Sequence, residues 1–183
     1  MKMKKTLITV AAVGIVAVGI VAAGSATAGG HTATAQFMNT KGEAIGKAEL
    51  TQSPHGTLIR LELRGLADSS GFHAIHIHAV GDCSDHDDGF QASGGHINPE
   101  GKKHGLMNSE GPDPGDFPNI YADAKGDVNY ELFTTLASLD GSVGARILGE
   151  DGAALVIHQN PDDHKTQPIG GAGSRIACGV INR

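Results

Sequence analysis

Apolar and polar residues alternate over several short stretches of the chain. In the clearest of them, residues 57–64, Ile59, Leu61 and Leu63 alternate with charged residues. Side chains on a strand point alternately to opposite faces, so this pattern predicts a strand with one buried and one solvated face. The same pattern, or a short apolar run between turns, predicts strands over 31–39, 46–52, 71–80, 128–132, 145–148, 153–158 and 175–181.

These strands indicate an all-β fold. Helical periodicity is nearly absent after the first 28 residues, and the 27 glycines punctuate the chain between the apolar runs. Eight or so short strands separated by turns are typical of a closed or sandwiched antiparallel architecture. The length of 183 residues fits a single domain.

Two long segments, 81–118 and 159–174, interrupt the strand pattern. Both are rich in Gly, Pro, Asp and His, and neither has regular periodicity. Structureless loops of this length are rare in compact domains unless they are functional or are held by internal contacts. We therefore expect both loops to contribute to a functional site.

The N-terminus has the pattern of an export signal. Three of the first five residues are lysines, residues 7–23 are almost wholly apolar, and Ala26-Thr27-Ala28 has the small-residue spacing of a cleavage site. This predicts a signal peptide over 1–28 and a mature domain over 29–183, located in the periplasm, in the cell envelope or outside the cell. An uncleaved membrane anchor stays open as an alternative, because a spanning helix needs about 20 apolar residues.

Charge and cysteine content limit the partners and the compartment. Removal of residues 1–28 takes away three lysines and no acids, so the formal net charge falls from −6 to −9. An acidic domain argues against nucleic acid or an anionic membrane surface as a partner. The two cysteines, Cys83 and Cys178, most simply form one disulfide in an oxidising compartment, with two free thiols as the alternative.

The segment 71–83 contains a pair of metal-ligand candidates. On a strand, His76 and His78 emerge on the same face about 6.6 Å apart, close enough to bind one ion. Ile75 and Ile77 then point into a core. His73 shares the inward face, so we expect a hydrogen-bonded interior histidine there instead of a ligand.

Further motifs follow in a fixed order along the chain. They are His76-x-His78, Gly95-His96-x-Asn98-Pro99, His104-Gly105, Gly115-Asp116, His158 followed by Asp162, and Gly173-Ser174-Arg175-Ile176-Ala177-Cys178-Gly179-Val180-Ile181. With these motifs the chain resembles copper-zinc superoxide dismutases of the bacterial, exported type. The resemblance covers most of residues 31–183.

The resemblance implies a fold, two cofactors and a set of site residues. The fold would be an eight-stranded Greek-key β-barrel or sandwich with two long functional loops. Copper would be held by His76, His78, His96 and His158, and zinc by His96, His104 and Asp116. Asp162 would link the outer nitrogens of His76 and His104, and Cys83 would pair with Cys178.

The implied function is disproportionation of superoxide to dioxygen and hydrogen peroxide by redox cycling of copper. His96 would pass a proton and Arg175 would dock the substrate anion, with Lys165 as a second nearby cation. The alternative function is a non-catalytic module that binds or delivers copper outside the cytoplasm. A homodimer is compatible with the sequence, which leaves the oligomeric state open.

One position departs from the family pattern. Three residues before the zinc aspartate, where the family usually has a third zinc histidine, this chain has Asp113 within Pro112-Asp113-Pro114. An aspartate oxygen and the near nitrogen of a histidine are the same number of bonds from the backbone, so we predict Asp113 as a zinc ligand. The alternative is an ordinary turn residue and a three-coordinate zinc.

The processed N-terminus offers a second copper-binding arrangement. Cleavage after Ala28 would leave Gly29-Gly30-His31 as the first three residues. A free amine, two backbone amides and a third-position imidazole suit square-planar Cu(II). The alternatives are that His31 only begins the first strand, or that the signal is cut elsewhere or kept. His55, His86 and His164 are expected to be turn or loop residues.

Overall fold

The structure is a computed structural model that describes residue 2, residues 31–66 and residues 70–183. The predicted signal peptide over 1–28, apart from Lys2, lies outside the described residues, as do Gly29 and Gly30. Within the described ranges, no helix is long and apolar enough to cross a membrane.

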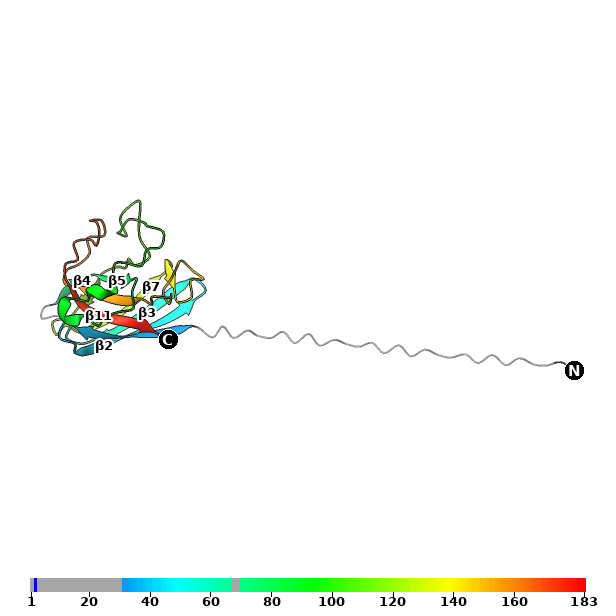
Figure 1. Ribbon diagram of the computed structural model, residues 1–183, viewed down its shortest axis with the longest axis horizontal. Coiled ribbons are helices and arrows are strands. Elements are labelled where there is room, and N and C mark those ends of the chain that lie inside the picture. Colours follow the sequence, from blue (N-terminus) through cyan, green and yellow to red (C-terminus); the bar gives the residue numbers. More distant parts are fainter. Residues whose placement is uncertain (1, 3–30, 67–69) are drawn as a thin grey trace.

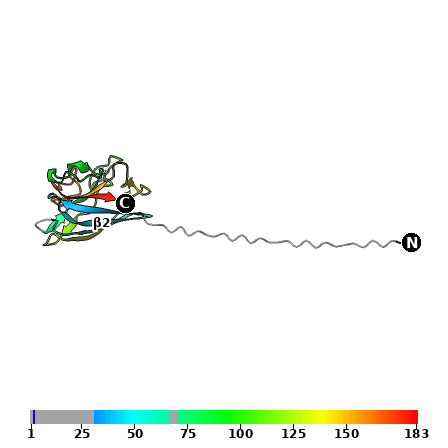
Figure 2. The ribbon, with the colours of Figure 1, turned by 60° about the horizontal axis from the view of Figure 1, so that its bottom comes forward.

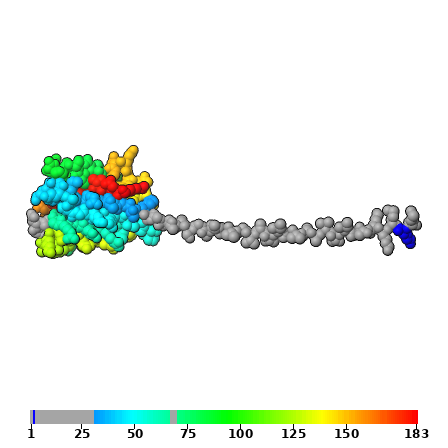
Figure 3. Space-filling view, turned by 90° about the horizontal axis from the view of Figure 1, so that it is seen from below, coloured from blue at the N-terminus to red at the C-terminus, as the bar shows by residue number. Residues whose placement is uncertain are grey.

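Most of the described chain forms one antiparallel sheet of seven strands that curls around a core (Figures 1 and 2). In spatial order the strands are β5 (Ile75–His78), β10 (Ala154–His158), β11 (Arg175–Asn182), β1 (Thr32–Asn39), β2 (Ala44–Ser53), β3 (Gly56–Leu63) and β7 (Val128–Thr134). The C-terminal strand β11 lies between β10 and the first strand β1, and Figure 3 shows its red surface beside the blue of the N-terminal strands.

Four shorter strands complete the fold. β4 (Gly71–His73) pairs with β6 (Ile120–Ala122), and β8 (Ala137–Ser138) runs parallel to β9 (Ala145–Arg146). Two 3₁₀ turns, η1 (His86–Asp88) and η2 (Gln91–Ser93), lie in the first long loop. If the two-residue strands are set aside and β4 and β5 are counted as one interrupted strand, eight strands remain, with β6 in place of the strand predicted over 145–148.

The structure confirms the all-β prediction and corrects two of the predicted strands. The run over 71–80 is interrupted at Ala74, whose N–H donates to Asn160 and whose carbonyl accepts from the N–H of His158. The strand therefore changes partner there, from β6 to β10. The strand predicted over 145–148 is confined to Ala145–Arg146, and the pattern missed β6 and β8, which are only three and two residues long.

The core fills the inside of the curled sheet. Ile59, Leu61 and Leu63 are at most 2% exposed, as their alternation with charged residues predicts. Ile75 and Ile77 are fully buried in the same cluster, so the intervening histidines of β5 face away from it. The apolar side of β5 thus fixes the direction in which His76 and His78 point.

A smaller apolar cluster surrounds the predicted disulfide on the other side of β10 and β11. Cys83 is bonded to Cys178, 95 residues away, with the Cα atoms 5.8 Å apart. Phe90, Ala154 and Val156 are fully buried around this bond. The disulfide therefore ties the beginning of the first long loop to β11.

The two long loops rise from the same side of the sheet and contact each other (Figure 1). The N–H of Met107 donates to the carbonyl oxygen of His164 over 3.1 Å. Gly105, with φ of +115°, lies so close to this carbonyl that an added Cβ would be 2.3 Å from its oxygen. Only glycine combines that backbone conformation with this approach.

We predict that the disulfide stabilises the protein mainly by restricting the unfolded chain. Replacement of both cysteines by serine should lower the free energy of unfolding by up to about 4.5 kcal/mol, because the bridge closes a long loop. Urea unfolding of the metal-free double variant and the wild type measures the difference. A reductant should destabilise the wild type and leave the variant unchanged. Equal unfolding midpoints for both proteins without reductant would contradict the prediction.

Candidate metal centre

Parts of the first long loop pair with the outer edge of β5. The N–H of Ile77 donates to the carbonyl of Gly115 over 3.0 Å, and the N–H of Ile97 donates to the carbonyl of Ile77 over 2.9 Å. These bonds place His96 and Asp116 beside the histidines of β5. The loop therefore adds potential ligands to those that the strand already carries.

Three histidines on β5 and β10 each have one ring nitrogen fixed by a hydrogen bond. His76 Nε2–H donates to Asp162 Oδ2 over 2.9 Å, His78 Nδ1–H to the Gly94 carbonyl over 2.8 Å, and His158 Nδ1–H to the Gly173 carbonyl over 3.1 Å. The opposite nitrogens are buried, have no hydrogen-bond partner among the described residues, and lie within 4.8 Å of one another. Such a convergence of unpaired nitrogens fits a bound metal ion.

Burial keeps these three imidazoles neutral. It lowers the pKa of His76 to about 4, against the opposing effect of Asp162, and lowers the pKa of His158 to about 3. The pKa of His78 lies well below its ordinary value for the same reason. Neutral imidazole is the form that binds a metal, so all three remain competent ligands at neutral pH.

His96 faces two groups of ligand candidates at once. Its ring centroid lies 4.2 Å from that of His76, and its Nε2 is buried without a partner in the described chain. Its Nδ1 lies 3.1 Å from Asp113 Oδ2 and 3.5 Å from Asp116 Oδ1. Burial opposes a charge on the ring, but contacts with these two carboxylates outweigh it and raise the pKa of His96.

The second group comprises His96, His104, Asp113 and Asp116, which can each offer one atom within 4.8 Å of the others. His104 Nδ1 lies 2.6 Å from Asp116 Oδ1, yet both atoms lack a well-aligned hydrogen bond within the described residues. Two such neighbouring atoms can both be ligands of one cation that lies beside them. A nitrogen and oxygen set of this kind suits zinc, whereas the histidine nitrogens beside it suit copper.

Asp113 has features of both predicted roles, that of a zinc ligand and that of a turn residue. Its Oδ1 accepts the N–H of Gly115 over 2.8 Å, as in a turn. However, the side chain is buried, only 3% of the residue is exposed, and the carboxylate faces His96 Nδ1. The hydrogen bond from Gly115 is therefore compatible with the contact to His96. It orients the Asp113 carboxylate toward the second group.

Asp162 forms a hydrogen bond with one histidine of each group. Its Oδ2 accepts from His76 Nε2–H and its Oδ1 from His104 Nε2–H, over 2.9 and 3.1 Å. Burial acts to raise the pKa of this carboxyl, but the two histidines outweigh it and hold the pKa far below its ordinary value. Burial likewise opposes charge on His104, and contacts with Asp116 and Asp162 raise the pKa of His104 to about 10.

Arg175 is the first residue of β11 and pairs with His158 of β10. Its guanidinium donates to the carbonyls of Phe90 and Gly94 over 2.6 and 2.8 Å and to Ser93 Oγ over 3.1 Å. All three acceptors lie in the loop that the disulfide ties to β11. The Cys83–Cys178 bond thus helps to keep this loop beside Arg175.

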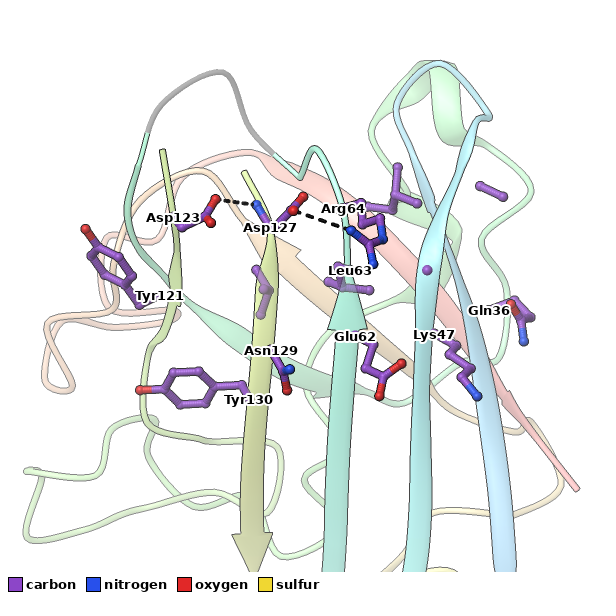
Figure 4. Close-up of a pocket in the computed structure, with 14 residues that line it drawn as sticks. Gln36, Lys47, Glu62, Leu63, Arg64, Tyr121, Asp123, Asp127, Asn129 and Tyr130 are labelled. Carbon is purple, nitrogen blue, oxygen red and sulfur yellow. Dashed lines mark hydrogen bonds and ion pairs between the residues drawn. The ribbon is translucent and has the colours of Figure 1, made fainter. Parts of the chain in front are cut away.

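These groups open into a hollow of about 410 Å³. It is lined by His78, Gly95, His96, Asn98, Lys102, His104, Asp113, His158, Gln167, Pro168, Ile169 and Arg175. A larger groove of about 1020 Å³ crosses the outer surface of β2, β3 and β7, with the Arg64–Asp127 ion pair at one end (Figure 4). None of the described residues that line this groove is a histidine, so it is not the metal centre.

Some expected residues lie apart from this centre. Lys165 does not line the hollow; a different lysine, Lys102, does. His31 is exposed, with Nδ1 3.4 Å from Asp140 Oδ2, and copper binding by Gly29-Gly30-His31 stays a prediction because both glycines lie outside the described residues. His73 is buried and its Nδ1–H donates to the His158 carbonyl over 2.9 Å, as expected for an interior histidine.

Sequence reasoning missed three polar side chains that hold the loops. Asn119 forms two hydrogen bonds with the backbone of Asp162. Its Oδ1 accepts the Asp162 N–H over 2.8 Å, and its Nδ2 donates to the Asp162 carbonyl over 2.9 Å. Gln167 binds the backbone of His104 in the same way. Its Oε1 accepts the His104 N–H over 3.1 Å, and its Nε2 donates to the His104 carbonyl over 2.8 Å. His164, expected in a solvated loop, is partly buried with Nε2 3.3 Å from the Asn119 amide. No sequence motif marks any of these contacts.

Comparison with known proteins agrees with this geometry. The family described as copper/zinc superoxide dismutase (SODC) matches residues 44–181. The chain belongs to this family. It is 48% identical to "Superoxide dismutase [Cu-Zn] 2" of Aquifex aeolicus, over 81% of this chain and 85% of the relative, and 47% identical to "Superoxide dismutase [Cu-Zn]" of Caulobacter vibrioides, over 81% and 84%.

A solved structure is also similar. A crystal structure of a SOD-like protein from Bacillus subtilis is 34% identical, with a TM-score of 0.74, and the match covers 80% of this chain and 96% of that one. This similarity confirms the β-barrel fold. Family membership implies copper and zinc as the cofactors, and the two groups of buried donor atoms fit them.

We predict that Gln167 stabilises the contact between the two loops. Replacement by alanine removes both bonds to the backbone of His104, which should lower the free energy of unfolding by about 1–2 kcal/mol. Hydrogen exchange of the His104 amide should become faster. Gln91→Ala is the control, because that exposed side chain contacts only its own turn. Unchanged exchange at His104 would contradict the prediction.

Proposed function

We propose that this protein is a copper-zinc superoxide dismutase that converts two superoxide anions into dioxygen and hydrogen peroxide. Copper would be held by the unpaired nitrogens of His76, His78, His96 and His158, and zinc by His96, His104, Asp113 and Asp116. Asp162 would orient one ligand of each metal through its two hydrogen bonds.

One observation carries this proposal. The hollow combines histidines whose unpaired nitrogens converge, among them His78 and His158, with the anchored guanidinium of Arg175. A site that only stores or delivers copper needs the first feature and has no use for the second. The alternative of a non-catalytic copper module is therefore not favoured.

Arg175 supplies the positive charge for substrate binding. Three hydrogen bonds to the loop fix its orientation before any substrate arrives, so little side-chain entropy is lost when an anion docks. Partial burial lowers the pKa of the guanidinium but leaves it charged at any pH at which the protein is folded. Superoxide would therefore meet a preorganised cation beside the histidines.

When bound, copper would supply the one-electron redox cycle that oxidises one superoxide and reduces the next. The reduced product takes up two protons, and His96 is the residue placed to hold one of them. Its Nε2 is buried and unpaired at the hollow, while carboxylates near Nδ1 raise the pKa of the ring. A proton at Nε2 would lie beside the hollow, where the reduced product could take it up.

We further propose that the protein acts outside the cytoplasm. The Cys83–Cys178 disulfide supports this, because such bonds persist in oxidising compartments. The predicted signal over 1–28 supports it from the sequence, although all but Lys2 of that segment lies outside the described residues. Mass spectrometry of the protein purified from the cell envelope tests both cleavage after Ala28 and retention of the segment as an anchor.

We predict that His158→Ala abolishes dismutation, because it removes one of the converging nitrogens. Arg175→Ala should retain copper but react about tenfold or more slowly, because the cation beside the histidines is lost. Superoxide consumption by metal-reconstituted protein measures both. His55→Ala, at an exposed turn between β2 and β3, is the control with wild-type activity. A copper-loaded wild type no faster than free copper would disprove the proposed function.

We predict opposite effects of two changes at Asp113. Asp113→Ala should lower zinc affinity by at least about tenfold, since one of four donors is lost. Asp113→His should retain tight binding, because its near nitrogen takes the place of the carboxylate oxygen. Competition with a coloured chelator measures both affinities. If alanine leaves zinc affinity unchanged, Asp113 is a turn residue only.

A further inference from the structure

Ser93 contacts both the cation and one of the histidines that the proposed function uses. It is the last residue of η2, is fully buried, and is not among the described residues that line the hollow. Its Oγ accepts Arg175 Nη1–H over 3.1 Å and lies 3.2 Å from Nδ1 of His78. One hydroxyl group therefore contacts the guanidinium proposed to bind the anion and an imidazole proposed to bind copper.

The bonding capacity of this hydroxyl is fully used. A serine hydroxyl has one hydrogen to donate and two lone pairs that accept. The hydrogen goes to the carbonyl oxygen of Phe90 over 2.8 Å, which fixes the direction of the O–H bond. The two lone pairs are then left for Nη1–H of Arg175 and Nδ1–H of His78. The position of each of these two donors is thus fixed relative to the other.

The hydrogen bonds of His78 determine which ring nitrogen carries its proton. Nδ1 lies 2.8 Å from the carbonyl oxygen of Gly94, which can only accept, so Nδ1 carries the hydrogen. Gly94 and Ser93 share this hydrogen as acceptors. Nε2 is left unprotonated, buried and without a partner in the described chain, and is therefore available to a metal.

Arg175 is held by the same short turn. Its Nη1 donates to the Phe90 carbonyl over 2.6 Å as well as to Ser93. Its Nη2 donates to the carbonyl of Gly94 over 2.8 Å. Of these three acceptors, Ser93 Oγ is the side-chain atom, so it is the contact that a substitution can remove while the backbone acceptors stay in place.

We propose that Ser93 is a positioning residue that fixes the guanidinium of Arg175 relative to His78. It would thereby set where a bound anion lies with respect to the copper. This inference rests on the proposed dismutase function for the roles of Arg175 and His78. Ser93 carries no charge, so it acts on the alignment of the anion and leaves the long-range attraction of the substrate unchanged.

Ser93→Ala tests this proposal, and Ser138→Ala is the matched control. Ser138 is also a fully buried serine, and its Oγ accepts the N–H of Val143 over 2.9 Å. It belongs to β8 and is not among the described residues that line the hollow. Both changes remove one buried, hydrogen-bonded hydroxyl, so a general loss of stability should appear in both variants.

The metal-free protein gives a readout that depends on neither copper nor activity. In Ser93→Ala, Nδ1–H of His78 keeps one acceptor instead of two. Its proton signal in the NMR spectrum should therefore shift, and its exchange with water should become about threefold faster. Ser138→Ala should give the wild-type signal and exchange rate.

Azide binding to the copper-loaded full chain tests the link to Arg175. Optical titration should show about fivefold weaker binding in Ser93→Ala, because the guanidinium loses one of its three bonds. Addition of Ser93→Ala to Arg175→Ala should cause no further loss, since the hydroxyl acts through the guanidinium. Dismutation by Ser93→Ala should be about threefold slower than in the wild type at both low and high salt, because no charge changes.

Three results would overturn the inference. Wild-type azide affinity in Ser93→Ala would show that the hydroxyl does not position the guanidinium, as would an undiminished loss in the Arg175→Ala background. An equal loss of azide affinity in Ser138→Ala would show a general effect of buried hydroxyls. A wild type without dismutase activity would end the proposed function, while the His78 signal and the azide titrations would still decide whether Ser93 positions the two groups.

Discussion

The rest of the site depends on the hydrogen bonds that the buried carboxylate of Asp162 accepts. It belongs to the second long loop, and it accepts one hydrogen bond from His76 on β5 and one from His104 in the first loop. A buried charge is costly unless it is paired and hydrogen-bonded, so this carboxylate is stable only where all three segments meet. Docking of the loops and alignment of the metal ligands are therefore a single event.

Two further residues, Asn119 and Gly170, lie close against Asp162. Asn119 holds its backbone from the segment before β6. Gly170, with φ of +62°, passes so near that an added Cβ would lie 1.7 Å from Asp162 Oδ1. Even an alanine there would displace the carboxylate, so the glycine is required by this approach as well as by its backbone conformation.

The two metal groups differ in what supports them. On the copper side, His76, His78 and His158 lie on strands whose register is fixed by sheet hydrogen bonds and by the core behind them. On the zinc side, the proposed donors come from the first loop, where backbone pairing with β5 places His96 and Asp116 and side-chain contacts hold His104 and Asp113. Three of the proposed copper ligands are thus positioned by the barrel itself, whereas His96 and the other proposed zinc ligands depend on the first loop being docked.

The sequence predicted those features that depend on local pattern. Alternation of apolar residues located the long strands and, through Ile75 and Ile77, the face on which the β5 histidines emerge. Ordered motifs located the remaining ligand candidates. The break at Ala74 was not predictable, because it follows from a change of partner strand between segments about 45 and 80 residues away.

Contacts made by loop side chains were equally invisible in the sequence. Gln167 and Asn119 bind backbone groups, and a backbone partner leaves no residue type to recognise. Distance along the chain likewise does not tell which lysine lines the hollow: Lys102 does and Lys165 does not.

Charge is the main consequence of the unusual aspartate at position 113. Two divalent metal ions would face three carboxylates, Asp113, Asp116 and Asp162, where the family pattern with a histidine at position 113 would present two. As a zinc ligand, Asp113 would remove one positive charge from the centre that an anionic substrate must approach. Arg175 lines the same hollow and is held by three hydrogen bonds, so it would then supply a larger share of the attraction for that anion.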